Sequence, residues 1–251
     1  MISISAVIIT LNEERNIERC IRSLQNIADE IIVVDSFSTD KTEELCRMPG
    51  VRFVQNKFDG YIEQKNFGLS LATQDYILSL DADEELSDVL RKSILEVKQN
   101  PAADGYTMNR LNIYCGRWIK HCGWYPDRKL RLAKKNLSKW GGDNPHDKLM
   151  LPTGATVKHL NGDVQHFSFA THAEYIRQQE KFAEISAMSY FKRGKKYSWF
   201  ELLFSPLVKF LKDYFFNLGF LDGADGWRIC TTATRATFLK YKKLRALHSG
   251  K

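Results

Sequence analysis

The sequence predicts an α/β fold, with a mostly parallel sheet covered by helices on both faces and followed by a C-terminal helical extension. Three observations support this class. Short apolar runs alternate with helical segments through the first hundred residues. These runs are almost continuously apolar, as expected of parallel strands that are buried on both faces. From Thr171 onward the apolar residues have helical spacing only.

The elements of the first hundred residues follow the order βαβαβαβα. Strands are expected over residues 3–10, 30–35, 51–55 and 75–80, and helices over residues 13–24, 40–47, 62–72 and 86–98. Asn12 and Asp40 are suited to cap the first two helices, because their side chains accept hydrogen bonds from the free N–H groups of a first turn. Parallel strands joined by helices require right-handed crossovers, which place helices over the sheet.

The pattern changes after residue 104. Strands are expected over 105–115 and 129–133, one or two short strands over 157–166, and a turn-rich loop over 140–147. Three helices follow, over 171–191, 199–218 and 223–244. We therefore predict an α/β domain over residues 1–173 and a basic helical region over residues 174–251.

The positive charge is concentrated in the last third of the chain. Residues 174–251 contain 15 Lys or Arg and 7 Asp or Glu, whereas residues 1–173 contain 22 and 23. Such asymmetry indicates a polyanionic partner, either nucleic acid or an anionic membrane. Cationic residues beside the Trp- and Phe-rich segment 199–216 favour an interfacial membrane anchor. A helical extension packed on the α/β domain is the alternative.

The five cysteines indicate a reduced compartment, because their number is odd and no Cys-x-x-Cys occurs. Cys115, His121 and Cys122 lie close in sequence, but their spacing matches no standard zinc pattern. The first residues show no signal-type segment, and no run of 18 apolar residues occurs. We therefore expect a cytoplasmic protein without a membrane-spanning helix.

An acidic cluster ends the fourth predicted strand. Asp81 and Asp83 are one residue apart, and Glu84 and Glu85 follow. Open α/β sheets bind ligands at the carboxyl ends of their strands, and carboxylates are preferred ligands of Mg²⁺ and Mn²⁺. The alternative is an acidic turn that interacts with the dipole of the next helix. Neither a Gly-x-Gly-x-x-Gly nor a P-loop motif occurs, which disfavours dinucleotide-binding and P-loop proteins.

Four motifs occur in this order along the chain: residues 7–14 (VIITLNEE), 32–40 (IVVDSFSTD), 64–68 (QKNFG) and 80–83 (LDAD). Their order and spacing resemble glycosyltransferase family 2, and most closely its bacterial branch that builds the lipopolysaccharide core. The resemblance covers residues 3–170 and continues more loosely through the tail. It implies the Rossmann-like GT-A fold, with a nucleotide-binding half over residues 1–100 and an acceptor half over residues 101–173. It also implies inverting transfer of a hexose from a nucleotide sugar, UDP-linked by default.

The resemblance assigns roles to individual residues. Donor-binding residues are expected near the strand ends and in the third helix, at Thr10, Leu11, Glu13, Asp35, Lys65 and Asp81. Asp83 would bind Mg or Mn, with His166 as a further ligand, and this divalent cation would stabilise the departing diphosphate. The alternatives are a solvated helix lysine for Lys65 and a core histidine for His166.

The acceptor hydroxyl must lose a proton as it attacks, and a positioned carboxylate is the usual base. The resemblance places Asp147 in this role, although Glu is more frequent there in the family. Asp127 is the second candidate, and a turn in a polar loop is the structural alternative for Asp147. Arg128 and Arg131 are expected to hold phosphates or an anionic acceptor, unless they lie on a solvated strand face.

The expected acceptor is a lipid-linked or lipopolysaccharide core saccharide. The enzyme would then be cytoplasmic and peripheral, at the inner face of the cytoplasmic membrane, and would bind no nucleic acid. Two other classes stay open. A nucleotidyltransferase also uses paired acids and Mg²⁺, but residues 11–14 lack the glycines of a phosphate loop. A nucleic-acid-binding module would explain the basic tail but not the near-neutral first 173 residues.

Overall fold

The computed structural model describes residues 1–143 and 146–249 and divides into two units. Unit 1 consists of Met1–Arg110 and Asp127–Phe167, and unit 2 of Leu111–Pro126 and Ser168–Lys251. Unit 1 contains the α/β part of the chain and unit 2 contains its long C-terminal helices. The domain boundary that we expect after residue 173 stays a prediction.

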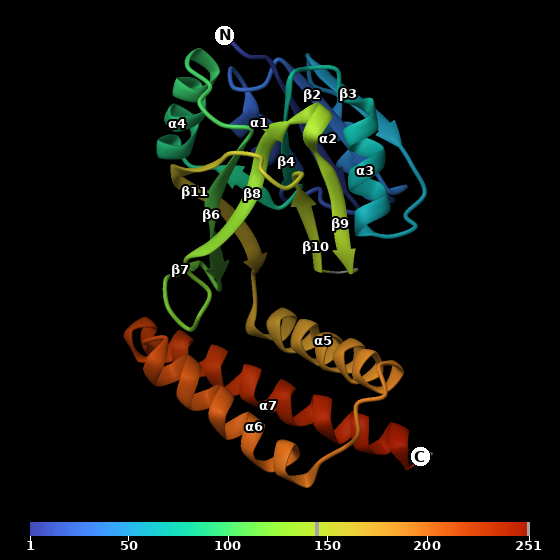
Figure 1. Cartoon of the computed structure of the whole chain (residues 1–251), viewed down its shortest axis with the longest axis vertical. Helices are drawn as coiled ribbons and strands as arrows, with labels where there is room; N and C mark the ends of the chain where they lie inside the picture. Colours follow the sequence, from blue (N-terminus) through green and yellow to red (C-terminus); the bar gives the residue numbers. More distant parts are fainter. Residues whose placement is uncertain (144–145, 250–251) are drawn as a thin grey trace. The chain divides into compact units, whose positions relative to one another are not determined.

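Four parallel strands form the first half of a nine-stranded sheet (Figure 1). They are β1 (Ile4–Thr10), β2 (Glu30–Asp35), β3 (Val51–Gln55) and β4 (Tyr76–Asp81). Their spatial order is β3-β2-β1-β4, and β1 pairs in parallel with both β2 and β4. The winding direction therefore reverses between β1 and β4. In open α/β sheets, ligands bind outside the carboxyl ends of the strands at such a switch point.

Side chains of these strands alternate between two hydrophobic clusters, one on each face of the sheet. In β1, Ile4, Ala6 and Ile8 belong to one cluster, and Val7 and Ile9 to the other. One face is covered by three helices, α1 (Ile17–Leu24), α2 (Thr42–Cys46) and α4 (Asp88–Gln99). The other face is covered by α3 (Tyr61–Leu71). The prediction of helices on both faces is confirmed.

Helix α3 approaches the sheet closely because Gly68 has no side chain. A Cβ at this position would lie 2.5 Å from Val7 Cγ1 and 3.2 Å from Val34 Cγ2. Both valines are buried, so we expect Gly68→Val to lower the free energy of unfolding by about 2–3 kcal/mol. Urea unfolding followed by circular dichroism measures the change. Ser70→Val introduces the same side chain at an exposed position of α3 and should change stability by less than about 0.5 kcal/mol. Equal stabilities of the two variants would contradict this packing.

Five further strands extend the same sheet beyond β4. The order continues as β4-β8-β6-β11-β5, and β7 pairs with β6. These strands are β5 (Glu84–Leu86), β6 (Gly105–Tyr114), β7 (Arg117–Ile119), β8 (Asp127–Lys134) and β11 (Val157–Phe169). Antiparallel pairs beyond β4 are β4–β8, β8–β6, β6–β7 and β11–β5. The pairing of β5 with β11 returns the chain to the acidic cluster that follows β4.

Residues 139–150 form a two-stranded hairpin instead of the predicted loop over 140–147. Strands β9 (Lys139–Asp143) and β10 (His146–Met150) pair antiparallel, with Trp140 opposite Leu149. Both side chains are buried in the hydrophobic cluster that includes α3. The loop prediction was wrong because Gly, Asn and Pro indicate turns, whereas the apolar side chains at residues 140 and 149 give the hairpin one buried face. Residues 144–145 of the predicted loop lie outside the described residues.

Unit 2 contains three long helices, as predicted. They are α5 (His172–Lys192), α6 (Trp199–Leu211) and α7 (Gly223–His248). A capping box starts α5, because the Thr171 hydroxyl accepts from the Glu174 N–H and the Glu174 carboxylate accepts from the Thr171 N–H. Helix α6 is followed by a π-helical turn, η2 (Lys212–Phe216), and a 3₁₀ turn, η3 (Gly219–Asp222). Over residues 1–143 and 146–249, none of the helices combines the length and the apolar character needed to cross a lipid bilayer.

Candidate active site

Three parallel strands of unit 1 end in polar residues at one edge of the sheet. Strand β1 ends at Thr10, β2 at Asp35 and β4 at Asp81. The register sets Thr10 beside Asp35 and Ile9 beside Asp81. Because the strands are parallel, these ends meet at the switch point between β1 and β4. The structure therefore brings together three residues that we predicted to bind the donor.

The loop after β1 is tied to the loop after β2 by Asn12. This residue has a φ of 55°, its N–H donates to Ser38 Oγ, and its Oδ1 accepts from the Thr39 N–H. Helix α1 begins only at Ile17. The prediction that Asn12 caps a helix starting at residue 13 was wrong, because its side chain is used between the two loops instead. The two loops beside the strand ends are thus joined to one another.

The predicted donor-binding residues near these loops differ in their surroundings. Thr10 is buried, and its Oγ1 has no hydrogen-bond partner among the described residues. Leu11 is exposed and Glu13 is half-buried. Burial raises the pKa of Glu13, although a hydrogen bond from Asn16 opposes the shift. Thr10 and Leu11 therefore offer a polar atom and an apolar surface to a ligand.

Asp35 is fully buried, and protein groups already satisfy its carboxylate. The carboxylate accepts hydrogen bonds from the Ser38 N–H and hydroxyl, and from Gln55 Nε2. The Gln55 bond is the longest of the three, at 3.3 Å. A ligand that binds Asp35 would therefore displace Gln55 most easily.

Asp83 and His166 face one another where β5 pairs with β11. The register sets His166 opposite Glu84, and the Phe167 N–H donates to the Asp83 carbonyl at 2.9 Å. His166 Nε2 then lies 3.0 Å from Asp83 Oδ2. Burial lowers the pKa of His166, but the Asp83 carboxylate outweighs burial and the pKa is raised. The two predicted metal ligands are therefore adjacent, although 82 residues separate them in the chain.

The Asp83–His166 pair suits a divalent cation that takes its other ligands from a substrate. Adjacent ligands of an octahedral ion, at about 2.0–2.1 Å from it, stand roughly 3 Å apart. The separation of 3.0 Å between His166 Nε2 and Asp83 Oδ2 fits this value. In the part of the chain that the structure describes, no three His, Cys, Asp or Glu residues group to hold a metal. Mg²⁺ in particular is often held by one or two protein groups together with phosphate oxygens.

Lys65 of α3 connects the end of β4 with the β9–β10 hairpin. Its Nζ lies 3.0 Å from Asp81 Oδ1 and 2.8 Å from Asp147 Oδ2. The ammonium group also lies 4.5 Å from the centre of the Trp140 ring. Only 4% of the Lys65 side chain is exposed. The alternative of a solvated helix lysine was therefore wrong, and Lys65 lies buried between two carboxylates.

Arg131 of β8 is a second buried cation and joins Asp81 to Glu84. Its Nη2 lies 2.7 Å from Glu84 Oε1 and 3.3 Å from Asp81 Oδ2. Burial alone raises the pKa of Asp81, but Lys65 and Arg131 together hold it well below its usual range. Asp81 is therefore ionised at neutral pH. Arg131 is buried, so the solvated strand face was wrong for this residue, whereas Arg128 is exposed.

The two candidate bases have different cation partners. Asp147 contacts Lys65 through Oδ2, and its second oxygen forms no ion pair within residues 1–143 and 146–249. Asp127 uses both oxygens, with Oδ2 at 2.8 Å from Arg110 Nη2 and Oδ1 at 3.0 Å from Lys129 Nζ. Asp147 therefore keeps an oxygen that can accept a proton, and the geometry favours it over Asp127.

Three residues of this network were missed at the sequence level. Glu84 carries no strand signal because β5 has three residues, and it is buried against Arg131. Arg110 is one of many strand cations, and Trp140 lies in a segment that indicated a loop. Only the proximity of Glu84 to Asp81 and Asp83 in the chain could have pointed to it.

The comparison with protein families decides the class of this site. The model described as "Glycosyl transferase family 2" matches residues 5–151, which include the strand ends, Asp83 and the hairpin. The chain belongs to glycosyltransferase family 2. It is therefore a glycosyltransferase, and not one of the nucleotidyltransferases or nucleic-acid-binding modules that we considered. Family membership and the sheet described above confirm the predicted GT-A fold.

Relatives of this glycosyltransferase match along nearly its whole length. It is 32% identical over 257 residues to an uncharacterized glycosyltransferase of Rickettsia typhi, with 98% of this chain and 88% of that protein covered. It is 30% identical over 261 residues to the lipopolysaccharide core biosynthesis glycosyltransferase LpsC of Rhizobium meliloti, with 99% and 94% covered. The resemblance to the lipopolysaccharide core branch is thus confirmed.

Solved structures resemble this glycosyltransferase more distantly. Glucosyl-3-phosphoglycerate synthase from Mycobacterium tuberculosis, in complex with Mn²⁺, UDP and glucosyl-3-phosphoglycerate, is 22% identical with a TM-score of 0.42, covering 54% of this chain and 58% of that one. TarS of S. aureus is 13% identical with a TM-score of 0.46, covering 99% and 92%.

Proposed function

We propose that this glycosyltransferase transfers a hexose, with inversion, from a UDP-linked sugar to a lipid-linked or lipopolysaccharide core saccharide, and that it requires Mg or Mn. The observation that carries the proposal is the Asp83–His166 pair, 3.0 Å apart, beside the carboxyl ends of β1 and β4. The name of the relative LpsC supports the acceptor class.

The donor nucleotide binds along the strand ends of β1 and β2. The unpartnered Thr10 hydroxyl donates to or accepts from the nucleotide, and Leu11 contacts its apolar face. Asp35 binds the base or ribose after its hydrogen bond with Gln55 breaks. Glu13 interacts electrostatically with Asp83 and His166. Asp81, fixed by Lys65 and Arg131, contacts the ribose or the sugar.

Asp83 and His166 would hold the divalent cation. Such an ion supplies positive charge where the departing diphosphate develops negative charge. The protein contributes the position of the two ligands, because the β5–β11 pairing and the Phe167 N–H fix Asp83. Neighbouring residues already neutralise Asp81, which leaves Asp83 as the acid beside an imidazole.

Asp147 accepts the proton of the acceptor hydroxyl. The hydroxyl oxygen forms a bond to the anomeric carbon as the bond from that carbon to the diphosphate oxygen breaks. The proton moves to the carboxylate of Asp147, which Lys65 holds in place through Oδ2. Direct displacement of this kind inverts the anomeric configuration. Lys65 thus joins the base to Asp81 on the donor side.

The location of the enzyme follows from the acceptor. A lipid-linked saccharide is presented at a bilayer, and the basic C-terminal region suits an anionic surface. We therefore propose a peripheral protein at the inner face of the cytoplasmic membrane, with no nucleic acid as partner.

Thermal unfolding with a panel of sugar nucleotides tests the donor. A ligand at about a hundred times its Kd adds about 2.7 kcal/mol to the stability of the folded state. For a chain of this size we expect Tm to rise by roughly 5–10 °C. The rise should need Mn²⁺ or Mg²⁺ together with a UDP-sugar and should disappear with EDTA. Stabilisation by a free NTP and a sugar phosphate, with no response to any sugar nucleotide, would contradict the proposal.

A further inference from the structure

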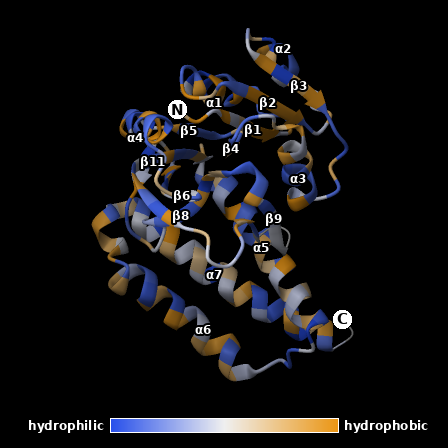
Figure 2. Ribbon diagram, turned by 45° about the horizontal axis from the view of Figure 1, so that its top comes forward, coloured by the Kyte–Doolittle hydropathy of each residue, from blue (hydrophilic) through white to orange (hydrophobic). Residues whose placement is uncertain are grey.

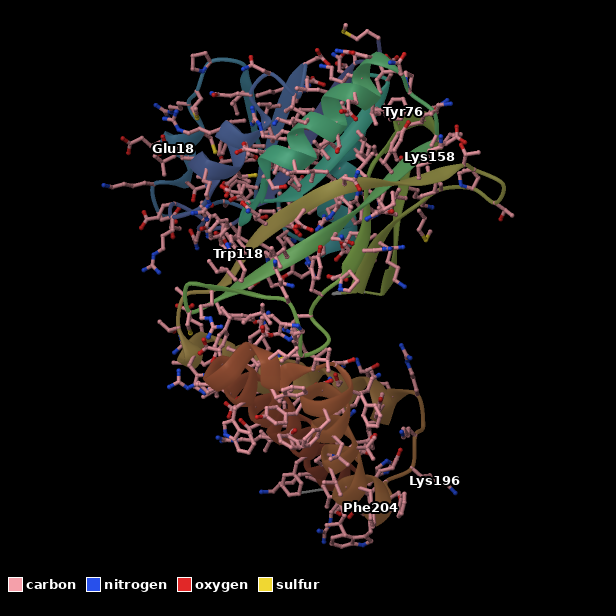
Figure 3. All side chains as sticks on the ribbon, turned by 90° about the vertical axis from the view of Figure 1, so that its left-hand side faces the viewer. Glu18, Tyr76, Trp118, Lys158, Lys196 and Phe204 are labelled. Atoms are coloured by element: carbon pink, nitrogen blue, oxygen red, sulfur yellow. The ribbon has the colours of Figure 1, made fainter. Side chains whose placement is uncertain are left out.

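Helix α6 exposes an apolar face to solvent. Pairs of large apolar residues recur every four positions and therefore lie on one side of the helix. Each is between 46% and 67% exposed: Trp199, Phe200, Leu203, Phe204, Leu207 and Val208. Phe216 of the turn η2 is 82% exposed. Figure 2 shows hydrophobic residues along α6, and Figure 3 labels Phe204 on this face and Lys196 in the segment before it.

The opposite side of α6 is already packed within unit 2. Leu202 and Pro206 are buried, and Leu202 shares a cluster with Ala187 of α5 and with Tyr241 and Leu244 of α7. The exposed face is therefore not needed to hold α6 in its unit. Soluble monomers rarely expose contiguous apolar patches larger than a few hundred Å², and larger ones mark interaction sites. We therefore expect the apolar face of α6 to bind a partner.

Positive charge surrounds this face. Residues 192–216 contain six Lys or Arg and two Asp or Glu. Both acids are already paired, Glu201 with Lys195 and Asp213 with Lys209. Lys196 and Lys212 are exposed and form no ion pair within the described part of the chain. The partner must therefore combine an apolar interior with an anionic surface.

We propose that the apolar face of α6, flanked by Lys196 and Lys212, binds the surface of an anionic lipid bilayer. An interfacial helix buries its apolar side among the acyl chains near the headgroups while its cations contact anionic lipids. A second copy of the chain fits less well, because a two-fold contact would bring two basic segments together. This inference rests on the proposed function in one respect: the proposed lipid-linked acceptor is the reason why the enzyme would bind a membrane.

Flotation with lipid vesicles tests this surface, using point substitutions that leave the packed side of α6 intact. Deletion of residues 192–251 would not serve, because α7 packs against α5 and the buried faces would be exposed. We expect the wild type to float with vesicles of phosphatidylcholine mixed with phosphatidylglycerol, and less at high salt. Leu203→Glu and Leu207→Glu should each weaken binding at least about tenfold, since each change replaces an apolar side chain that would be buried in the bilayer by a charged one. Lys196→Glu should weaken it about fivefold or more.

The matched control is Phe58→Glu, which places the same charge on an aromatic residue of unit 1 that is 42% exposed. Its binding to vesicles should equal that of the wild type. Unchanged flotation of Leu203→Glu and Leu207→Glu would overturn the assignment. The assignment would also be overturned if the wild type did not bind vesicles but formed a dimer in analytical ultracentrifugation, and if these substitutions dissociated that dimer.

The same variants separate this inference from the proposed function. Leu203→Glu and Leu207→Glu should keep the full rise in Tm with UDP-sugar and Mn²⁺, because the residues proposed to bind donor and metal all belong to unit 1, whereas α6 belongs to unit 2. Loss of flotation with intact donor binding supports the membrane surface. Absence of any donor effect in the wild type contradicts the proposed function, whatever the vesicles show.

Discussion

Asp83→Ala is expected to abolish metal-dependent donor binding and to reduce sugar transfer by at least about a thousandfold. Asp83 is the carboxylate that faces His166 at 3.0 Å, and removing it leaves the imidazole as the single protein ligand of the pair. A divalent ion contributes several kcal/mol of charge stabilisation to a departing diphosphate, and about 4 kcal/mol corresponds to a thousandfold. The readouts are transfer rate and the Mn²⁺-dependent rise in Tm with UDP-sugar.

Glu85→Ala is the matched control for this change. Glu85 belongs to the same acidic cluster, but its carboxylate pairs with Arg19 at 3.3 Å. Its loss removes one nearby negative charge without touching the Asp83–His166 pair, so donor binding should keep its metal dependence. If Asp83→Ala still bound donor with unchanged dependence on Mn²⁺, the metal site would be wrongly placed.

The parallel half of the fold was predictable because each strand is a local apolar run. Residues 30–35 and 51–55 were predicted to the residue. The first strand ends at Thr10 as predicted, and the fourth ends at Asp81, one residue after its predicted end. Parallel strands bring their carboxyl ends to one edge whatever the loops do. The grouping of the donor-side residues therefore came from local pattern and elementary sheet geometry.

The ion pairs of the site were not predictable from local pattern. Lys65 and Asp147 are 82 residues apart, and their contact depends on a hairpin whose Gly and Asn content indicated a loop. In the sequence, Arg131 is one of several cations in an alternating strand. Its burial beside Asp81 depends on the pairing of β8 with β4. Tertiary pairing, and not propensity, decides which charged residues become buried partners.

The role predicted for His166 came from the family resemblance, and its position depends on strand pairing. Family resemblance named it as a metal ligand, while its sequence context also suited a core histidine. Antiparallel pairing of β11 with β5 sets it against Asp83, so burial and a carboxylate partner occur together. The imidazole of His166 is mostly buried, and it contacts Asp83, the residue with which it was predicted to bind the metal.

Asp147→Asn is expected to lower kcat by about 10²–10⁴-fold while donor binding stays intact. The amide keeps the size of the side chain and can still accept a hydrogen bond from Lys65, but it cannot take a proton from the acceptor. Lys65 also retains its contact with Asp81 at 3.0 Å, so the donor side keeps its buried cation. Transfer assays measure kcat, and thermal unfolding with UDP-sugar and Mn²⁺ measures donor binding.

Asp127→Asn is the comparison that decides between the two carboxylates. Asp127 has both oxygens engaged by Arg110 and Lys129, so its substitution should retain most of the transfer activity. A loss of kcat in Asp127→Asn, with normal turnover in Asp147→Asn, would move the base to β8. Lys65→Met adds a further distinction, because Asp147 would lose the cation that positions it. In that variant kcat should fall even though the carboxylate remains, since a base must lie within hydrogen-bond reach of the proton it accepts.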